Sequence, residues 1–429
     1  MVGDDNVIQK PKGTYDVYGN SGKNIKYIEK ILEALMQKYN YEYVRTPIFE
    51  ASNLYHRGVG ETSDIVKKET YDFVDRGDRS MTLRPEGTAG VVRSYIENKR
   101  YADATQPVKC WYYGPMYRYE RPQSGRFREF YQFGVEVFGS SNPILDAEVI
   151  SIPVTLYKLL GLKGIKVKIN SLGDTKTRLE YKEALLNHFK PYIDSLCSDC
   201  KERYNKNPLR ILDCKVDHDK DCMKNAPKIL DYLTEDAKKH FDKVKEYLEL
   251  LEIPYEVDPN IVRGLDYYTN TVFEVEAEIN GFKGNNVLCG GGRYDKLVET
   301  LDGPETKAVG FALGFERLLN VLDMENINLD IDTLDLYIIP MSDNETNYAY
   351  KLCQTLRMNG FSTDIDYIKR NIKANFKQAD RLNAKYIIII GEEEIKNKIL
   401  TIKDNIKKEE YKVKEEELID FLDGVIEND

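Results

Sequence analysis

Three arginines stand beside glycines or aromatic residues, or at the ends of expected strands, where their side chains could bind phosphates. They are Arg118, Arg263 and Arg317. A planar guanidinium group binds phosphate oxygens in a bidentate manner and offsets developing negative charge. Any one of them, taken alone, is more often a surface or salt-bridge residue. Their occurrence in three separate segments favours a polyphosphate site if carboxylates accompany them.

Four carboxylates in apolar or aromatic surroundings do accompany these arginines: Glu86, Glu120, Glu136 and Asp266. Glu136 lies between two valines in an alternating strand pattern. A carboxylate within an apolar strand is costly unless it is paired or binds a ligand. An ion-paired structural glutamate is the alternative, and the pattern favours the ligand-binding interpretation over it.

Histidine-based chemistry finds little support, because the few histidines lie outside these segments. The four are His56, His188, His218 and His240. Ser-His, Cys-His and H-E-x-x-H chemistries are therefore poorly supported. The triplet Gly290–Gly292 allows close approach of the backbone to a ligand, although glycine runs also serve as plain turns, and no P-loop pattern is present. A reaction that depends on electrostatics and orientation fits better.

The segments that must position these residues have a readable pattern. Apolar residues at helical spacing predict a helix over residues 23–40. Residues 41–49 are expected to form a strand that Pro47 closes, with the proline at its edge. Two long strands, 110–119 and 130–138, are predicted to pair antiparallel through a charged loop at 120–129. The elements expected next are a helix (147–160), a strand (165–170), a Lys-rich helical stretch (175–253), strands (271–279 and 286–288), a helix from residue 294 and a strand-helix pair (308–322).

The last hundred residues have a different organisation. A polar span at 323–333 resembles a linker. Beyond it, the segments 334–340, 344–359, 362–365, 372–382 and 386–390 alternate as βαβαβ. Such alternation indicates a compact α/β domain with a largely parallel sheet. The charge-rich run at 407–417 is most simply a solvated face.

Length and composition set limits on the class of protein. The chain has 429 residues, which favours two to three domains, and its 62 Lys and Arg minus 72 Asp and Glu give a net charge of −10. This balance argues against nonspecific coating of DNA or of an anionic membrane, while a local basic cluster could still bind phosphates. No segment approaches a membrane span, and we expect a cytoplasmic protein.

Five segments carry the motifs of a known enzyme family. They are L-R-P-E-G-T (83–88), the stretch 114–139, R-G-L-D-Y-Y-T (263–269), G-G-G-R-Y-D (290–295) and G-F-A-L-G-F-E-R-L (310–318). Together they resemble histidyl-tRNA synthetase, a class II aminoacyl-tRNA synthetase, over nearly the whole chain. The segments 41–50, 113–136 and 309–318 look like class II motifs 1, 2 and 3. The segments 263–269 and 290–295 are similar to two signatures that separate the histidine enzyme from its class II relatives.

The resemblance implies a particular α/β multidomain fold. Residues 1–330 would form a class II catalytic domain, an antiparallel sheet flanked by helices, with a mostly helical insertion at about 175–258. Residues 331–429 would form a C-terminal α/β anticodon-binding domain. The family places its homodimer interface at motif 1. Asn40 stands there where the family commonly has glycine, and asparagine tolerates a left-handed backbone better than most residues.

The resemblance also implies the reaction. L-Histidine attacks the α-phosphate of ATP to give histidyl-adenylate and diphosphate, and a ribose hydroxyl at the end of tRNA(His) then takes the aminoacyl group and releases AMP. ATP would enter with Mg²⁺ on its β- and γ-phosphates. The partners implied are histidine, ATP, tRNA(His) and a second copy of the chain, without DNA or membrane.

Roles for individual residues follow from the same similarity. The catalytic cations would be Arg118, on the α-phosphate and the substrate carboxylate, and Arg263, which in this family replaces a metal ion beside the α-phosphate. The histidine-binding residues would be Glu86, Thr88, Arg118, Gln132, Glu136, Arg263, Tyr267 and Tyr268. The ATP-binding residues would be Arg118, Glu120, Arg126, Phe130 and Arg317. Within these sets, Glu136 and Tyr268 would hold the imidazole, while core aromatics on a strand are the alternative for the two tyrosines.

Four of the seven cysteines have a spacing seen in metal sites. Cys197-x2-Cys200 is a usual half-site for tetrahedral zinc, and Cys214 with Cys222 forms a looser second half. A structural Zn²⁺ at these four cysteines is one interpretation. Free, partly buried thiols are the other, because the family does not require a metal there.

Two other functions are compatible with parts of the pattern. A catalytically silent relative that serves as a regulatory subunit of the first enzyme of histidine biosynthesis resembles the same core, but such relatives typically lack the C-terminal domain and lose signature residues. This chain keeps both. A tRNA-binding module without chemistry would not need Arg263, Glu120 and Arg317 intact. Histidine-dependent exchange of diphosphate into ATP separates the three, because only the synthetase shows it.

Overall fold

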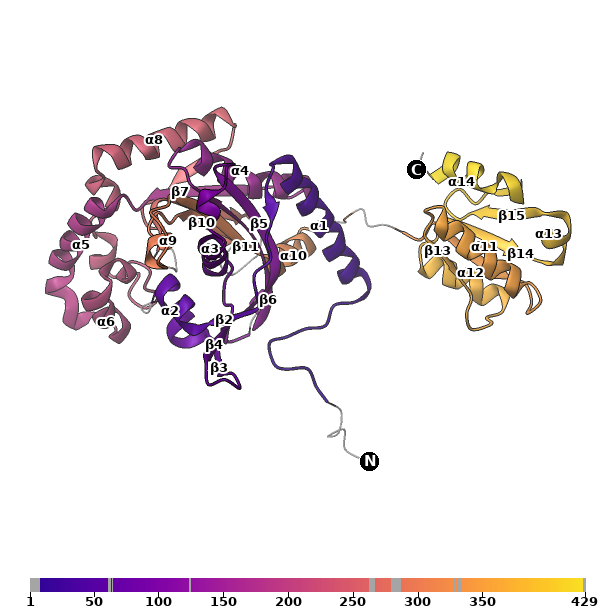
Figure 1. Ribbon diagram of the computed structural model, residues 1–429, viewed down its shortest axis with the longest axis horizontal. Helices are drawn as coiled ribbons and strands as arrows, with labels where there is room; N and C mark the ends of the chain where they lie inside the picture. The colour runs from indigo at the N-terminus through magenta and orange to yellow at the C-terminus, as the bar shows by residue number, and fades with distance from the viewer. Residues whose placement is uncertain are drawn as a thin grey trace. The chain divides into compact units, whose positions relative to one another are not determined.

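The computed structural model describes residues 8–60, 63, 65–122, 125–261, 267–278, 287–327, 329 and 333–426 (Figure 1). The chain divides into two compact units, residues 1–329 and 330–429. Among the described residues, no helix has the length and apolar character needed to cross a lipid bilayer.

The first unit is built on one large, mostly antiparallel sheet. Its strand order is β1-β5-β6-β11-β10-β9-β7-β8, with parallel pairing only at the two edges, β1 with β5 and β7 with β8. The strands are β1 (Glu42–Tyr43), β5 (Val108–Tyr117), β6 (Glu129–Phe138), β7 (Ile165–Ser171), β8 (Tyr255–Val257), β9 (Thr269–Ala277), β10 (Val287–Arg293) and β11 (Ala308–Gly314). The predicted antiparallel pair of long strands is therefore confirmed as β5 and β6.

Both faces of this sheet are covered. Strand β6 shows why, because Phe133, Val135 and Val137 enter the largest core while Phe138 enters a second core on the opposite face. The first core is shared with α1 (Gly19–Lys38), α4 (Ile144–Leu159), α8 (Glu235–Leu250) and α10 (Phe315–Met324). The second is shared with α3 (Thr88–Glu97) and α9 (Leu297–Thr300). Gln132 and Glu136 alternate with the first set and so face the α3 side.

The prediction of one strand over residues 41–49 is wrong, because the chain leaves the large sheet after Tyr43. Pro47 has no N–H to give to a sheet ladder, and the chain re-forms a strand at β2 (Phe49–Ala51), which pairs with β4 (Ser80–Leu83). With β3 (Tyr71–Val74) these make a small antiparallel sheet next to α2 (Ser52–Val59), and the short helices η1 (Ile65–Glu69) and η2 (Arg100–Ala102) complete this part. Asn40, just before β1, has a φ of 57°, the left-handed region that asparagine tolerates.

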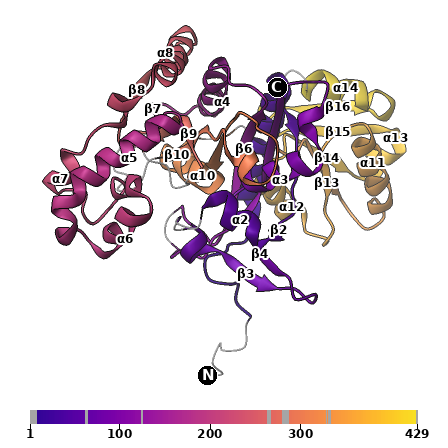
Figure 2. The ribbon, with the colours of Figure 1, turned by 60° about the vertical axis from the view of Figure 1, so that its left-hand side comes forward.

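A largely helical region follows β7 and has a core of its own. Figures 1 and 2 show α5, α6 and α8 grouped at the end of the sheet where β7 lies. The elements are α5 (Thr175–Phe189), η3 (Lys190–Ser195), α6 (Ser198–Lys206), η4 (Pro208–Ile211), α7 (Asp221–Lys224), η5 (Ile229–Tyr232) and then α8. Asp174 and Thr234 cap α5 and α8 by accepting from Thr177 N and Ala237 N. Between these two long helices the chain forms only short helical pieces.

The second unit contains a five-stranded sheet in the order β13-β12-β14-β15-β16. Strands β12 (Leu336–Pro340), β13 (Thr363–Ile365) and β14 (Tyr386–Ile390) are parallel, which confirms the βαβαβ prediction. The helices are α11 (Thr346–Met358), α12 (Ile372–Arg381), α13 (Glu392–Asn397) and α14 (Leu418–Ile426), with η6 (Glu415–Glu417) before the last.

A hairpin at the edge of this second sheet was not predicted. Strands β15 (Ile399–Asp404) and β16 (Glu410–Lys414) pair antiparallel, and β16 lies within the charge-rich run interpreted as a solvated face. Only Val413 of β16 is buried, so the charged residues of this edge strand remain in solvent as predicted while its backbone completes the sheet.

Candidate active site

A cavity of about 230 Å³ lies between the N-terminus of α3 and strands β6, β10 and β11. Every residue that the sequence assigned to the histidine or ATP site and that the structure describes lines this cavity. They are Glu86, Thr88, Arg118, Glu120, Arg126, Phe130, Gln132, Glu136, Tyr267, Tyr268 and Arg317. Arg263 and Asp266 lie outside the described residues.

Glu136 is fully buried at the wall of the cavity and is held by hydroxyl groups. Thr88 Oγ1 donates to Glu136 Oε1 at 2.7 Å, Tyr112 OH reaches the same oxygen at 3.5 Å, and Tyr294 OH donates to Oε2. No cation among the described residues forms an ion pair with it. Burial raises the pKa of Glu136 to about 8, although the hydrogen bonds from Tyr294 and Thr88 act in the opposite direction. The carboxyl group is therefore held ready for a partner that is not part of the described chain.

A glycine on the neighbouring strand makes room for this carboxylate. Gly310 of β11 lies directly opposite Glu136 in the antiparallel register. A Cβ on Gly310 would stand 2.0 Å from Glu136 Oε2, well inside contact distance. Gly291 of β10 has the same function between strands, since a Cβ there would lie 2.2 Å from the carbonyl oxygen of Gly310. The glycine triplet thus lies within a central strand rather than in a turn.

A second buried carboxylate, Glu86, lies beside the first and binds the start of α3. Its two oxygens accept from the backbone N–H of Thr88 (2.7 Å) and of Ala89 (2.9 Å). Burial raises the pKa of Glu86, and these hydrogen bonds together with Arg118 oppose that rise. Nearby, the Oε1 atom of Gln132 is buried and has no hydrogen-bond partner among the described residues. An unpaired acceptor in a cavity suits a ligand that brings a donor.

The opposite end of the cavity is cationic. Arg118 Nε donates to the carbonyl of Pro85 at 2.8 Å, and its guanidinium group lies 5.1 Å from the centroid of the Phe130 ring. Glu120 stands between two arginines, 3.2 Å from Arg126 Nη1 and 4.0 Å from Arg118 Nη1. Arg317 comes from α10 and donates to the carbonyl of Val287 at 2.8 Å.

Two adjacent tyrosines close the wall next to Glu136. The rings of Tyr267 and Tyr268 are 4.8 Å apart, and that of Tyr267 is 5.7 Å from Tyr294. Burial raises the pKa of Tyr267 well above its usual value, so its hydroxyl stays protonated at neutral pH. The cavity thus offers a carboxyl group and phenol hydroxyls at one end and guanidinium groups at the other.

The comparisons with known proteins agree with this geometry. Residues 13–318 match the family profile described as histidyl-tRNA synthetase, and residues 335–424 match the profile of an anticodon binding domain. The chain is 52% identical over 400 residues to the histidine–tRNA ligase of Staphylococcus haemolyticus, covering 93% of this chain and 95% of that protein. The chain belongs to the histidyl-tRNA synthetase family.

Solved structures support the same assignment of family and fold. The crystal structure of apo S. aureus histidyl-tRNA synthetase superposes with a TM-score of 0.84 at 46% identity, over 97% of this chain and 100% of that one. A Bacillus halodurans structure described as an ATP phosphoribosyltransferase regulatory subunit/histidyl-tRNA synthetase gives a TM-score of 0.63 at 23% identity, over 89% of this chain and 97% of that one. At that identity the second likeness concerns the fold alone. The predicted class II fold with an anticodon-binding domain is confirmed for this member of the histidyl-tRNA synthetase family.

Sequence reasoning missed the hydroxyl partners of Glu136. Tyr112 lies opposite Gly134 in the pairing of β5 with β6, and Tyr294 follows β10 directly. Both read as ordinary core aromatics in the sequence. Had the register of the two long strands been known, the position of Tyr112 two residues from Glu136 across the pair would have revealed the first contact.

A second feature that the sequence did not reveal joins the N-terminal segment to the ATP end of the cavity. Glu316 is buried and accepts from Tyr15 OH (2.6 Å) and from the backbone N–H of Tyr131 (2.8 Å). The ring of Tyr15 lies 4.7 Å from that of Phe127. The segment around Tyr15 therefore packs against the loop that carries Arg126 and fixes one side of it.

Of the four predicted zinc ligands, the structure groups only three. Sulfur atoms of Cys197, Cys200 and Cys214 lie together with a carboxylate oxygen of Asp217. Cys222 is not part of this group. It lies on α7, the short helix after the loop that carries Asp217, and its backbone carbonyl contacts His188 Nε2 at 2.7 Å. The structure thus places Asp217, where the sequence had suggested Cys222, beside the three sulfur atoms.

Proposed function

We propose that this protein attaches L-histidine to tRNA(His) in two steps, with ATP as the energy source and AMP and diphosphate as products. In the first step the histidine carboxylate attacks the α-phosphorus of ATP, and diphosphate leaves as histidyl-adenylate forms. In the second, a ribose hydroxyl of the tRNA terminus attacks the histidyl carbonyl carbon and AMP leaves. One observation carries the proposal: in a chain of this family, a single cavity joins a buried carboxyl group and phenols at one end with three arginines at the other.

The buried end suits the side chain of histidine. An imidazole has two nitrogens, and Glu136 together with Tyr268 would give each of them a partner, while Tyr267 lines the same wall. A competing amino acid without these nitrogens would leave buried polar groups unpaired. The free-energy cost of those unpaired groups makes the site selective for histidine. The charged amino group of the substrate would be received by Glu86, Thr88 and Gln132. The unpaired Oε1 of Gln132 supports that part of the assignment.

The cationic end suits ATP. Arg118 would hold the α-phosphate and the histidine carboxylate together, which orients the attacking and the attacked groups. Arg317 would stack on adenine and reach the γ-phosphate, and Phe130 would cover the other adenine face. Because Arg126 is paired with Glu120 at 3.2 Å, ATP must take Arg126 onto its terminal phosphates and leave Glu120 free to accept from the adenine amino group.

Two further elements of this proposal concern cations. Arg263 would stabilise the charge that develops at the α-phosphate, as the sequence resemblance implies. Mg²⁺, when bound with ATP, neutralises the outer phosphates, and the lining residue Glu274 offers an oxygen ligand of the type that Mg²⁺ prefers.

A second cavity suits the tRNA end. It has a volume of about 500 Å³ and shares Tyr267 with the first cavity. Among the described residues that line it there is no Asp or Glu, but there are five basic residues: Arg57, Arg178, Lys182, Lys206 and Lys296. A basic lining beside the reacting centre suits the phosphates of an RNA terminus. The anticodon-binding domain would read unstacked bases at the other end of the tRNA.

We also propose a cytoplasmic homodimer. Five large apolar residues of β1 to β3 and their connections are exposed, namely Tyr43, Ile48, Phe49, Phe73 and Val74. Three of them lie in the segment 41–50 that looks like motif 1, and Phe73 and Val74 lie on β3, in the same small sheet as Phe49. A second copy of the chain would cover all five. Sedimentation equilibrium at micromolar concentration should give twice the mass of the chain, and a monomer at that concentration would contradict the proposal.

The decisive experiment is histidine-dependent exchange of labelled diphosphate into ATP, followed by aminoacylation of tRNA(His) transcript. We expect exchange only with histidine, and charging only when tRNA is added. A protein that binds tRNA but shows no exchange would contradict the proposed function. Equal exchange with another amino acid would contradict the assignment of the buried end of the cavity.

A further inference from the structure

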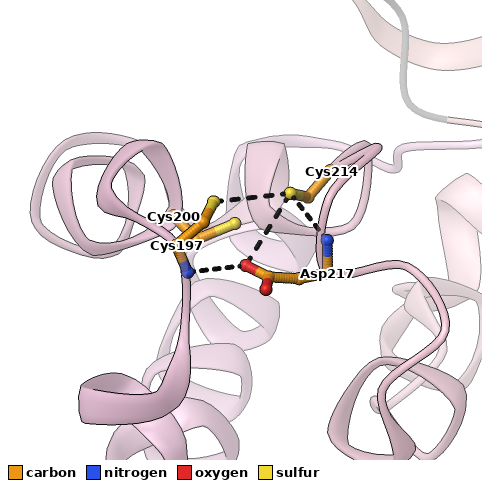
Figure 3. Close-up of side chains that lie close together, drawn as sticks. All are labelled: Cys197, Cys200, Cys214 and Asp217. Carbon is orange, nitrogen blue, oxygen red and sulfur yellow. Dashed lines mark hydrogen bonds between the residues drawn. The ribbon is translucent and has the colours of Figure 1, made fainter.

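Three cysteines and one aspartate gather in the helical region that follows β7. Figure 3 shows Cys197, Cys200, Cys214 and Asp217 with their sulfur and carboxylate atoms turned toward one another. One ligand atom from each lies within 4.8 Å of all the others. Asp217 is 1% exposed, and the three cysteines are free thiols. Neither the histidine site nor the ATP site uses any of them.

The spacing of these atoms fits a tetrahedral metal ion. A Zn²⁺ bound by thiolates at about 2.3 Å places its sulfur ligands about 3.8 Å apart, and a carboxylate oxygen at about 2.0 Å would lie about 3.5 Å from each sulfur. Cys197 Sγ and Cys214 Sγ are 3.7 Å apart, and Cys214 Sγ is 3.8 Å from Asp217 Oδ2. We propose that this cluster binds one structural Zn²⁺ through three cysteine thiolates and the carboxylate of Asp217.

The groups around the cluster orient its ligands, as the surroundings of a metal site do. The backbone N–H of Asp217 donates to Cys214 Sγ (3.3 Å), and that of Cys197 donates to Asp217 Oδ2 (2.8 Å). Lys220 Nζ lies 2.7 Å from the other oxygen, Oδ1, so Oδ2 is the one turned to the sulfurs. Three thiolates, one carboxylate and Zn²⁺ carry a net charge of −2, and Lys220 reduces the local excess to −1.

The position of the cluster explains what a metal would do there. Cys197 and Cys200 stand at the start of α6, and Cys214 with Asp217 in the loop before α7. Between α5 and α8 the longest helix is α6, with nine residues, so this stretch has little regular structure to hold it. A metal ion that joins two such segments contributes folding free energy directly. The same segments supply Lys206, Asn207, Pro208 and Leu209 to the second cavity.

The first test is the metal content of the full-length protein. The protein is purified under reducing conditions, without a metal-affinity tag and without chelator, and is analysed by inductively coupled plasma mass spectrometry. We expect about one zinc per chain, as for a closed tetrahedral site. Less than a tenth of an equivalent, with no uptake when Zn²⁺ is added to the reduced protein and the excess removed, overturns the proposal.

The second test identifies the ligands. Co²⁺ replaces zinc in thiolate sites and gives an absorption spectrum whose charge-transfer intensity follows the number of bound thiolates. We expect Cys214→Ser and Asp217→Asn each to weaken Co²⁺ binding at least tenfold, the loss typical when a ligand or its support is removed. Cys222→Ser is the matched control, a buried cysteine of the same region outside the cluster, and should leave both affinity and spectrum unchanged. Loss of binding in Cys222→Ser with retention in Asp217→Asn overturns this ligand set.

A third measurement asks what the ion supports, and it alone rests on the proposed function. Removing the metal from the wild-type protein should raise the KM for tRNA at least fivefold and leave histidine-dependent exchange within twofold, because the segments that carry the cluster supply lining residues to the second cavity and none to the first. Equal losses in both reactions would overturn the local role, while the metal content would still report on the site itself.

Discussion

Two carboxylates of the first unit, Asp146 and Glu136, are equally buried but differ in their partners and in the direction in which their pKa is shifted. Asp146 of α4 accepts hydrogen bonds of 2.6 to 3.0 Å from the guanidinium group of Arg293, and its Oδ1 lies 3.2 Å from His240 Nε2. Burial would raise the pKa of Asp146, but Arg293 and His240 lower it below its usual value. Among the described residues, the side chain of Glu136 has only hydroxyl partners, Tyr294 being one of them, and burial raises its pKa to about 8.

The difference teaches that burial alone does not mark a functional carboxylate. Asp146 finds its cation within the chain and joins α4, the end of β10 and α8, so its charge is used by the fold. Glu136 finds none among the described residues and faces a cavity, so its charge or its proton is available to a ligand. A buried group whose pKa is shifted by burial without a compensating partner is a site candidate, whereas a paired one is structural.

The largest expected effect comes from breaking the paired carboxylate. Asp146→Asn removes the nearer counter-charge of the Arg293 guanidinium, which is 1% exposed, and leaves it Asp295 Oδ1 at 3.6 Å. We expect a loss of about 3 kcal/mol in the free energy of unfolding, because removing one partner of a buried ion pair costs about 3–5 kcal/mol and Asp295 offsets part of that cost. Urea denaturation followed by circular dichroism measures it. Asp302→Asn, which breaks the exposed pair with Arg57, is the control and should change stability little; equal effects would contradict the contrast between the two carboxylates.

The next effect comes from changing the unpaired carboxylate. Glu136→Gln should leave the fold intact and lower kcat/KM for histidine in diphosphate exchange about 10- to 100-fold, because it removes a hydrogen-bond partner of the imidazole in a buried site. The KM for ATP should stay within twofold.

A control for this change lies on the same strand. Glu129, at the other end of β6, is not among the residues that line the cavity, so Glu129→Gln should exchange diphosphate normally. If Glu136→Gln destabilises the protein as much as Asp146→Asn does, Glu136 is a structural residue and the histidine assignment fails.

Much of the first cavity could be predicted from the sequence, partly from local patterns and partly from the family resemblance. The alternation around Glu136 placed it on the face of β6 opposite Val135 and Val137, and that face lines the cavity. The strand end that carries Arg118 was equally evident. Local periodicity tells which face a side chain takes, and it sufficed for Glu136, whereas Arg126, Gln132 and the other lining residues were assigned through the family resemblance.

What the sequence could not reveal were contacts between distant segments. Arg293 and Asp146 are 147 residues apart, and Tyr15 and Glu316 are 301 apart, so no local pattern connects them. The sequence suggested Cys222 for the cysteine cluster, whereas the structure places Asp217 there, and the reason is the same. Which side chains meet depends on how a loop with little regular structure folds back. Cysteine spacing alone does not describe such a loop.

The third effect is a pH dependence that distinguishes the two carboxylates directly. In the folded protein Glu136 keeps its proton up to a pKa of about 8, whereas the unfolded chain releases it near its ordinary value of 4.5. Its contribution to stability is therefore complete below pH 4.5 and is lost as the pH rises toward 8, by at most about 1.4 kcal/mol for each pH unit. Asp146, with its lowered pKa, contributes above its ordinary pKa and loses this contribution only in acid.

Urea denaturation at pH 5, 6, 7 and 8 tests this pH dependence. Glu136→Gln cannot ionise, so its stability relative to wild type should rise steadily over the series. Asp146→Asn should stay less stable than wild type at every pH of the series, because Asp146 stays ionised throughout. A difference between wild type and Glu136→Gln that does not change with pH would mean that Glu136 ionises normally in the folded protein, and the contrast between the two carboxylates would be lost.

The smallest effect extends the comparison from anions to cations. In the second cavity Lys206 is paired with Glu202 at 2.9 Å, whereas no described carboxylate pairs with Lys182, which lines the same cavity. If an unpaired charge awaits a ligand here as well, Lys182→Ala should raise the KM for tRNA about three- to tenfold and reduce the salt dependence of log KM by about 0.7, the loss of one phosphate contact with a single strand. Lys206→Ala should change both less, because its charge is already partly neutralised, and neither variant should affect histidine-dependent exchange. A larger effect for Lys206→Ala would show that pairing within the chain does not distinguish structural cations from ligand-binding ones in this cavity.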